Sequence, residues 1–355
     1  MLTDEQRALQ EAVRSLLTRH ATSAAVRAAT TKPRGYDEKL WDLLCGQIGV
    51  AGLSIPTEYG GAGASLTETA LVLEELGRTL APTPLLGSAV LAAQALLATR
   101  NHDACARLLP GIADGTRIAA LAWTDATGAW TEPVVTAAEN PQGWRLDGEA
   151  HHVLAGDTAE IVLVAAQTGS EAGLFEVDPA GTYREVTPAM DLTRRLARIA
   201  FDATPARHLG PVDLSAVKDI AVAALAAEQV GAAARALELT VEYAKTRVQF
   251  GQPIGSFQAL KHRMADMYVL VESARSAAYA AAADPASHAA VAKVYCSEAL
   301  HQVTAEMIQL HGGIAITWEH DAHLYFKRAH GTTHLFGPPQ QYVTRLTRNA
   351  LSPTA

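Results

Sequence analysis

The stretch RVQFGQPIGSF, residues 247–257, joins two long segments whose composition favours helix. Gly251, Pro253 and Gly255 would interrupt a helix, and Arg247 would follow the end of the preceding one, where a cation suits the helix dipole. The stretch contains no acidic residue, although the whole chain carries a net charge of −8. Taken alone, it could be an ordinary surface turn.

A second glycine-rich stretch, QLHGGIAITWEHD at residues 309–321, also follows a long helical segment. Gln309 offers an amide, and Gly312 and Gly313 offer bare backbone with exposed N–H groups. Arg247 would add the planar positive fork that suits a pyrophosphate. Together, the two stretches indicate a site for a phosphate or a ring carbonyl.

The composition describes a chain of 355 residues, 49 % hydrophobic, with room for a large core and more than one domain. Its mildly acidic charge of mixed sign gives no reason to expect nucleic acid or a membrane as partner. Cys45, Cys105 and Cys296 match neither a disulfide framework nor a metal pattern, which indicates thiols in a reducing compartment. The polar N-terminus is no signal peptide, and polar residues interrupt the alanine-rich stretches before the ~20 residues of a membrane span. We therefore expect a cytoplasmic protein.

Three regions differ in pattern, and we expect three domains, at residues 1–115, 116–212 and 213–355. The first is mostly helical, and Thr3 with Gln6 forms a capping-box signature. The second consists of short runs rich in Val, Ile, Leu and aromatic residues with turn residues between them, which predicts a β domain. The third is helical again. This order, without a GxGxxG motif after a strand, argues against a doubly wound nicotinamide dehydrogenase.

Three long helices are predicted in the last region, at 213–246, 257–282 and 286–310. Asp284 and Pro285 separate the second from the third. Long alanine-rich helices with short connections indicate an antiparallel bundle. Because small residues let helices approach closely, the bundle could continue across a subunit interface. We expect that interface to exceed the ~1,600 Å² of a standard contact.

Several motifs resemble those of one known family. RVQFGQPIGSFQALKHRMADM (247–267), the TEYGGAG loop (57–63), the β domain and QLHGG (309–313) match the acyl-CoA dehydrogenase family in order. The resemblance covers essentially the whole chain. It implies an α+β multidomain fold with an N-terminal helical domain, a middle β-barrel domain and a C-terminal four-helix bundle. It also implies FAD as the cofactor and an acyl-CoA thioester as the substrate.

The resemblance also implies which residues contact FAD. The arginine of R-x-x-F-G, here Arg247, would reach the flavin pyrophosphate of a neighbouring subunit, and Phe250 would pack on the cofactor. Thr124 would hydrogen-bond the flavin ring. The other positions that match the family's cofactor contacts are Gln258, Gln309, Leu310, His311, Gly312, Gly313 and Gln340.

The flavin-ring half of this resemblance is incomplete. Asp125-Ala126 follows Thr124 where the family has Glu-Pro, and residues 152–155, HVLA, stand in place of W-x-T-N. Histidine for tryptophan removes a stacking surface, and leucine for threonine removes a hydroxyl. Trp130 stands where many relatives have a serine near the thioester tail. The phosphate half of the site is therefore better kept than the ring half.

The family's reaction needs a carboxylate base, which removes the α-proton of the thioester while the β-hydrogen leaves as hydride to flavin N5. In most relatives this base is the glutamate of an E-G-T-x-Q segment, and in others it lies near the start of the first bundle helix. Phe336 stands at the first position and Ala221 at the second, so neither base is present. Glu228, two turns further along the same helix face, is a weak candidate. We favour an ion pair or a solvated helix face for it.

Other acidic and histidine residues near the C-terminus are not assigned to catalysis. Glu319 and Asp321 are expected to pair with Lys327, with Arg328 or with a neighbouring subunit. The histidines fit no compact ligand set, so we expect polar interface residues and no metal. They are His311, His320, His323, His330 and His334.

Some members of the family contain two different chains in a heterotetramer, a longer one with the base and a shorter one without it. This chain resembles the shorter one, in pairs that oxidise thioesters of bulky acids such as sterol side chains. The expected partners are a longer base-bearing homologue, an acyl-CoA in a shared site and electron-transfer flavoprotein as electron acceptor, with fewer flavins than subunits. Two alternatives stay open: a homomeric enzyme with a displaced acid such as Glu228, and a scaffold subunit that binds neither flavin nor CoA.

Overall fold

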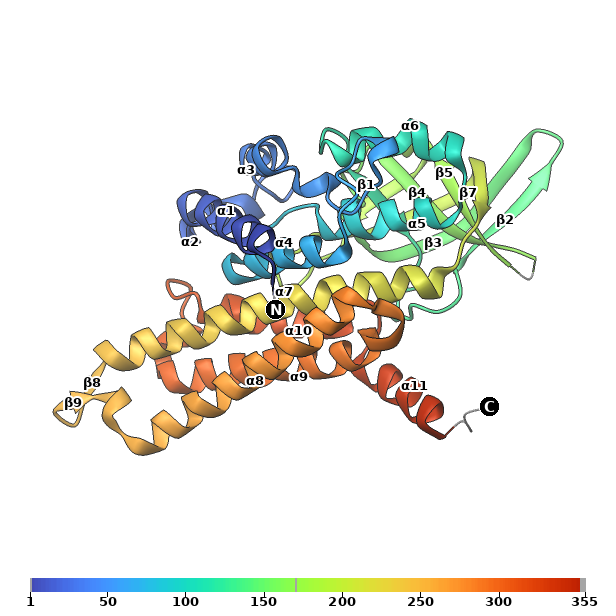
Figure 1. Cartoon of the computed structure of the whole chain (residues 1–355). Coiled ribbons are helices and arrows are strands. Elements are labelled where there is room, and N and C mark those ends of the chain that lie inside the picture. Colours follow the sequence, from blue (N-terminus) through green and yellow to red (C-terminus); the bar gives the residue numbers. More distant parts are fainter. Residues whose placement is uncertain (1, 170, 352–355) are drawn as a thin grey trace.

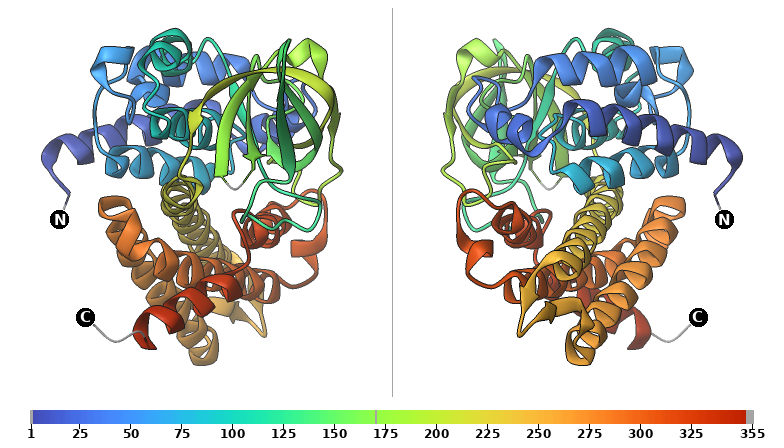
Figure 2. Two further views of the ribbon diagram at one scale, coloured as in Figure 1. Left: turned by 90° about the vertical axis from the view of Figure 1, so that its right-hand side faces the viewer. Right: turned by 90° about the vertical axis from the view of Figure 1, so that its left-hand side faces the viewer.

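The computed structural model describes residues 2–169 and 171–351. Its elements form a helical part, a sheet and a second helical part in chain order, as the fold class predicts. Figure 1 shows helix α7 running through the middle of the molecule, with the first helices and the sheet on one side and the later helices on the other. Figure 2 shows the same division with α7 seen nearly end-on.

The first part is helical because its polar and apolar residues alternate at helical spacing and its helices have capped starts. The predicted capping box is confirmed, since the Thr3 side chain accepts from Gln6 and the Gln6 side chain accepts from the Thr3 backbone. Ser65 and Glu68 form a second one. The helices are α1 (Asp4–His20), α2 (Ser23–Thr30), α3 (Glu38–Leu43), α4 (Leu66–Thr79), α5 (Ala93–Ala98) and α6 (His102–Ala113).

The sheet lies within the predicted β region, and its strands are β1 (Ala119–Ala122), β2 (Val135–Asn140), β3 (Gly143–Leu154), β4 (Ile161–Thr168), β5 (Glu171–Val177), β6 (Tyr183–Val186) and β7 (Leu196–Pro211). Strand β5 pairs with both β4 and β7, so the path through β4, β2, β3, β7 and β5 closes on itself. The predicted barrel is therefore confirmed. Alternate apolar side chains fill its interior, among them Val162, Val164, Phe175 and Ile199.

The second helical part contains the three predicted long helices. They are α7 (Leu214–Thr246), α8 (Gln258–Ala283) and α9 (Pro285–His311), followed by α10 (Ala322–His334) and α11 (Pro339–Leu351). Asp284 ends α8 and caps α9, because its carboxylate accepts from the Ser287 N–H at 3.2 Å. Helices α7, α8 and α9 pack along one another, and α8 runs antiparallel to the other two (Figure 1).

Helix α7 is the core helix that joins the two helical parts. At its crossing with α4 the backbones touch: a Cβ on Gly231 would lie 1.8 Å from the Glu74 carbonyl oxygen, and one on Gly77 would lie 2.0 Å from that of Glu228. By length and composition α7 could cross a membrane, contrary to the expectation that polar residues interrupt every such stretch. However, 89 % of the most apolar 18-residue segment of α7 is buried inside the protein, so these residues form part of the hydrophobic core.

The structure adds an element that the sequence did not predict between α7 and α8. Strands β8 (Val248–Gln249) and β9 (Gln252–Pro253) form a small hairpin where only a turn was expected. Its two-residue loop is Phe250-Gly251, with φ of +50° and +79°. Two positive φ values are what a type I′ turn requires, and glycine but not phenylalanine adopts them freely.

Candidate functional site

The predicted site residues separate into two groups at opposite ends of α7. This helix has 33 residues, which corresponds to about 50 Å at the rise of an α-helix. Arg247 and Gln258 flank the β8–β9 hairpin beyond its C-terminal end (Figure 1). At the other end, Thr124 bridges to His151 of the barrel strand β3, and Phe336 packs on Trp130, whose carbonyl accepts from Lys218 near the start of α7. The two groups of one chain therefore form two separate candidate sites.

At the hairpin end, Arg247 and Phe250 point away from the protein's own core. The Phe250 ring is 92 % exposed, and Arg247 is exposed and makes no ion pair with any residue in the described part of the chain. The hairpin is held in place by its backbone, since the Ile254 N–H donates to the Arg247 carbonyl at 2.8 Å. The hydrogen-bonded hairpin therefore presents an unpaired guanidinium and an aromatic ring outward.

The stretch 309–313 lies at the same end, because its helix α9 runs parallel to α7. Gln309, Gly312 and Gly313 are exposed. Gly312 adopts φ +67° at the end of α9, and a Cβ there would meet open space, so this backbone is accessible to a ligand. These three positions fit their predicted role.

Leu310 and His311, by contrast, are buried in the bundle. The His311 ring stacks on Tyr243 with centroids 4.4 Å apart, and its Nδ1 donates to the Met307 carbonyl at 2.8 Å. Burial lowers the pKa of His311, which keeps the ring neutral. These two residues fix the end of α9 to α7 within this chain.

The hairpin end also exposes several large apolar side chains. Trp318 follows the short helix η7 (Gly312–Ile316) and is 63 % exposed, with the Lys327 ammonium 4.3 Å from its ring centroid. The other exposed apolar residues here are Val248, Ile314 and Ile316. Exposed apolar side chains clustered with a free cation are typical of a surface that another chain covers.

The donor set at this end fits the phosphate part of FAD. It combines the Arg247 guanidinium with the amides of Gln258 and Gln309 and the backbone around Gly312. Gln258 already lies within 2.8 Å of the His262 ring, which orients its amide. These residues could bind a pyrophosphate through charge-assisted hydrogen bonds.

At the barrel end, both usual base positions are apolar and buried. Phe336 is fully buried, and its ring meets Trp130 edge-on with centroids 4.9 Å apart. Trp130 in turn meets Trp123 edge-on at 5.4 Å. Ala221 is also fully buried, near the start of α7. The two positions that the resemblance matches to the base therefore hold packed apolar side chains.

Beside these rings lies a cavity of about 420 Å³ between the barrel and helices α10 and α11. His152 reaches it from a bulge in β3, where the register of β3 on β7 shifts and the residue adopts φ +53°. Gln340 is exposed nearby on α11. The lining side chains include Trp130, His152, Met190, Arg194, Leu335 and Pro338.

Thr124, the residue predicted to bind the flavin ring, is fully buried at this end. Its hydroxyl donates to the Ala129 carbonyl, and its own carbonyl accepts from the His151 N–H at 2.8 Å. The hydroxyl is thus already engaged within the protein, so the fit to a flavin ring is weaker here than the fit to phosphate at the hairpin end.

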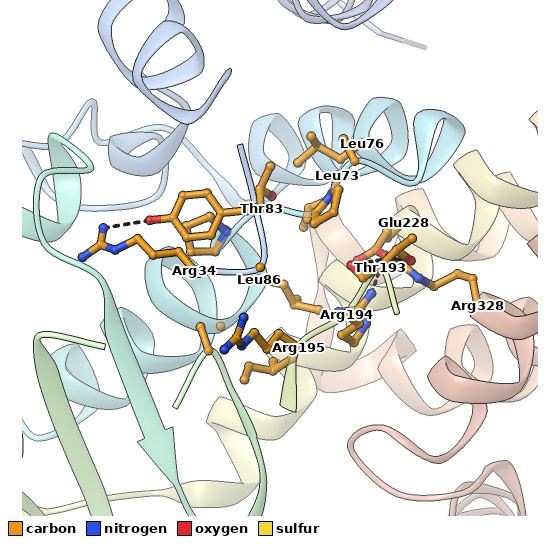
Figure 3. Close-up of a pocket in the computed structure, with 18 residues that line it drawn as sticks. Arg34, Leu73, Leu76, Thr83, Leu86, Thr193, Arg194, Arg195, Glu228 and Arg328 are labelled. Atoms are coloured by element: carbon orange, nitrogen blue, oxygen red, sulfur yellow. Dashed lines mark hydrogen bonds and ion pairs between the residues drawn. The ribbon is translucent and has the colours of Figure 1, made fainter. Parts of the chain in front are cut away.

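A second, smaller pocket lies deeper, between α4, α7 and the loop before β7 (Figure 3). Its volume is about 50 Å³, which leaves room for one or two water molecules. Arg194 lines both this pocket and the larger cavity, and it forms an ion pair with Glu228. Arg328 pairs with Glu228 as well, and its Nε donates to Asp191 at 2.7 Å. We call Asp191, Arg194, Glu228 and Arg328 the buried ion network.

The ion network determines the charge of Glu228. Burial alone would raise the pKa of this carboxyl, but Arg194 and Arg328 outweigh burial and hold its pKa below the usual value. Glu228 is therefore an ionised member of a buried ion pair, the role that the sequence favoured for it. Sequence reasoning missed Asp191 and Arg194, because the partners lie 34 to 137 positions apart and no local spacing marks them.

The expected pairs of the acidic residues near α10 need correction. Asp321 pairs with Arg27 of α2 at 2.7 Å and not with Lys327 or Arg328. Arg328 instead turns inward to the buried ion network, and Lys327 lies over Trp318. The pairing partners come from other domains, so sequence proximity misled the prediction. Within the residues that the structure describes, no group of three or more His, Cys, Asp or Glu side chains could hold a metal ion.

Comparisons with known proteins identify the family. The family model for the acyl-CoA dehydrogenase N-terminal domain matches residues 3–116, and that for the acyl-CoA dehydrogenase C-terminal domain matches residues 220–351. The chain belongs to the acyl-CoA dehydrogenase family. Acyl-CoA dehydrogenases are flavoprotein oxidoreductases that act on CH–CH bonds with FAD as cofactor, as the sequence predicted.

Two kinds of relative among the acyl-CoA dehydrogenases are informative. Acyl-CoA dehydrogenase IpdE2 of Mycobacterium tuberculosis is 49 % identical over 97 % of this chain and 96 % of its own length. A chain of the ChsE4-ChsE5 complex from Mycobacterium tuberculosis is 30 % identical, with a TM-score of 0.91 over 100 % of this chain and 99 % of its own. A chain of the Tcur3481-Tcur3483 steroid ACAD is 35 % identical, with a TM-score of 0.89 over 98 % of this chain and 99 % of its own.

Proposed function

We propose that this acyl-CoA dehydrogenase chain is the base-less subunit of a heteromeric enzyme that desaturates an acyl-CoA thioester between Cα and Cβ. The observation that carries the proposal is the state of the two base positions, because Phe336 and Ala221 are both apolar and fully buried. A carboxylate is required to remove the α-proton. A chain that fills both positions with packed apolar atoms needs another chain to supply the base.

The hairpin end supplies this chain's contribution to the shared site. Arg247 would neutralise the flavin pyrophosphate on a neighbouring subunit, and Phe250 would pack against the cofactor there. Gln258, Gln309 and the backbone around Gly312 would complete the phosphate contacts. FAD, when bound, accepts the β-hydrogen as hydride. This chain's residues bind and orient the cofactor, and the partner provides the base.

Two observations support an unlike partner. The exposed apolar side chains and free guanidinium at the hairpin end need a covering surface, and the chain's own barrel end lies about 50 Å away along α7. Two of its structural relatives are assemblies named for two different proteins, one of them a steroid ACAD. We infer a longer, base-bearing homologue as partner, a bulky acyl-CoA of the sterol type as substrate, electron-transfer flavoprotein as electron acceptor and the cytoplasm as location.

A homomeric enzyme that uses Glu228 as a displaced base is the competing function. Glu228 is buried, lines a pocket of about 50 Å³ and is held by two arginines. Proton abstraction would give up both ion pairs in a buried environment, which makes this carboxylate a poor base. A scaffold without flavin would leave the outward Arg247 and Phe250 without a role.

Turnover measurements separate these functions. We expect the chain purified alone to show no dye-coupled oxidation of an acyl-CoA, and the complex with a longer homologue to be active. Replacing the base glutamate of the homologue with glutamine should abolish that activity, whereas Glu228→Gln in this chain should not. Activity of the isolated chain that disappears with Glu228→Gln would establish the homomeric enzyme instead. If the complex is active and Arg247→Ala leaves its flavin content unchanged, this chain is a scaffold.

A further inference from the structure

We propose that Trp130 and Phe336 form a plug that excludes the acyl group of a thioester from this chain, so that each pair of unlike subunits binds one acyl group. The inference rests on the proposed function and extends it. The missing base would explain why this chain alone does not turn over an acyl-CoA. A site filled by aromatic rings would also explain why the acyl group does not bind to this chain. The two residues thereby determine which ligand this chain accepts, because they exclude the acyl group and not coenzyme A.

The plug belongs to a row of aromatic rings that begins at Phe336, the first of the two expected base positions. Phe336, Trp130 and Trp123 meet edge to face in sequence, at 4.9 and 5.4 Å between ring centroids. None of the three is more than 2 % exposed. Trp130 and the neighbouring Leu335 also form a wall of the 420 Å³ cavity. A ligand that enters this cavity from outside would therefore meet the Trp130 ring before it reached Phe336 or Ala221.

The Trp130 side of the plug is braced by α7. The Lys218 ammonium donates to the Trp130 carbonyl at 2.9 Å. Ala221, the second base position, is three residues further along the same helix, and residues at this spacing share a helix face. The brace thus places Trp130 over the part of α7 where other relatives present their glutamate.

The Phe336 side is braced by three hydrogen bonds from α9 and α11. The Tyr342 hydroxyl donates to the Phe336 carbonyl at 2.5 Å. The Lys293 ammonium, which is fully buried, donates to the carbonyls of Leu335 at 2.8 Å and Thr332 at 3.0 Å. These bonds fix the backbone on both sides of the ring.

Phe336 also adopts a costly backbone conformation, with φ +62°. Side chains other than glycine, asparagine and aspartate rarely occupy this region, and such outliers persist where the surroundings enforce them. Glycine would fit this backbone without strain, yet the position holds a large ring that fills the interior. The strain is therefore consistent with a role for the ring itself.

Further along α7, little space is left for an acyl chain. The buried ion network occupies the region between α4, α7 and the loop before β7, and the remaining pocket is about 50 Å³. Even a short alkyl chain is larger than one or two water molecules. An acyl group therefore needs the space that the rings of Phe336 and Trp130 fill.

The test compares coenzyme A with octanoyl-CoA, using calorimetric titration of the full chain. Because the plug excludes only the acyl group, the wild-type chain should bind the two ligands with affinities equal within about twofold. Phe336→Gly with Trp130→Ser opens the interior, and octanoyl-CoA should then bind at least tenfold more tightly than coenzyme A. Trp144→Phe is the control, since Trp144 packs on Phe175 and His208 in the barrel and not on the plug. It should behave as wild type.

Two results would overturn the proposal. One is a tenfold preference for octanoyl-CoA in the wild-type chain. The other is a folded double variant, verified by circular dichroism, that shows no preference or binds neither ligand. If the double variant does not fold, Phe336→Gly alone decides, because glycine suits φ +62° at this position. The flavin content of the complex tests the proposed function separately, since the plug could exclude acyl groups even if every chain held a flavin.

Discussion

Replacing Phe250 with asparagine should stabilise the isolated chain and at the same time impair assembly with FAD. The residue occupies the first loop position of the hairpin with φ +50° and is followed by Gly251 at +79°. An ordinary side chain in the left-handed region costs roughly 1–2 kcal/mol, whereas asparagine tolerates it and Asn-Gly is the preferred pair in such a turn. Because the ring is 92 % exposed, its removal sacrifices almost no burial.

We therefore expect Phe250→Asn to raise the free energy of unfolding of the isolated chain by about 1 kcal/mol. In the complex the same change removes an aromatic ring that would be buried against the cofactor and the partner. Burial of such a side chain contributes roughly 1.5–3 kcal/mol, so FAD should bind about tenfold to hundredfold more weakly. One substitution would thus move the two properties in opposite directions.

The assays are denaturant unfolding of the isolated chain and FAD retention of the co-purified complex during gel filtration. Phe250→Ala is the matched control, because alanine loses the ring but keeps the cost of the left-handed conformation. It should lower FAD retention without a gain in stability. Full FAD retention in Phe250→Asn, or a loss of stability in the isolated chain, would refute the interpretation of the hairpin as a strained contact for another subunit.

Four further predictions concern other parts of the molecule. Arg247→Ala should lower the FAD content of the complex, because a charge-assisted pair worth roughly 1.5–3 kcal/mol is lost; unchanged flavin absorbance would remove Arg247 from the site. Glu228→Gln should destabilise the chain by about 3 kcal/mol, measured by urea unfolding, because it leaves buried arginines short of a partner; a neutral effect would contradict the ion network. Burial lowers the pKa of Lys293 to about 7, so above that pH the folded chain binds fewer protons than the unfolded chain. The free energy of unfolding should therefore rise from about pH 7 toward pH 10. If a Lys293→Met variant keeps this rise, another group causes the pH dependence. Gly231→Ala should cost about 3 kcal/mol or more in a thermal melt, whereas Gly46→Ala, where a Cβ meets nothing within 4 Å, should cost far less.

The parts of the fold that local sequence determines were predicted well. The three long helices of the bundle appear within one or two residues of their expected limits, because alanine-rich composition and the Asp284-Pro285 break act locally. The barrel was expected only as a set of short strands. Its closure depends on β5 pairing with both β4 and β7, which no local pattern reveals.

The sequence named candidate site residues but did not reveal how the fold arranges them. Arg247 and Phe250 are outward-facing, as a contact to another subunit requires, but the hairpin that presents them was not foreseen. Leu310 and His311 match the family motif and yet are buried, because the Tyr243 ring covers His311 within this chain. The apolar residues at both expected base positions could be read from the sequence, whereas the packing of Phe336 on Trp130 required the fold, since 206 positions separate them.

The most direct test of the account is the ratio of flavin to protein in the complex of this chain with a longer, base-bearing homologue. Flavin absorbance after denaturation, divided by the protein mass of each chain, gives that ratio. Because this chain offers phosphate contacts to another subunit and fills its own base position, we predict one FAD for each pair of unlike chains. One FAD for every chain, or a stable yellow homotetramer of this chain alone, would contradict the account.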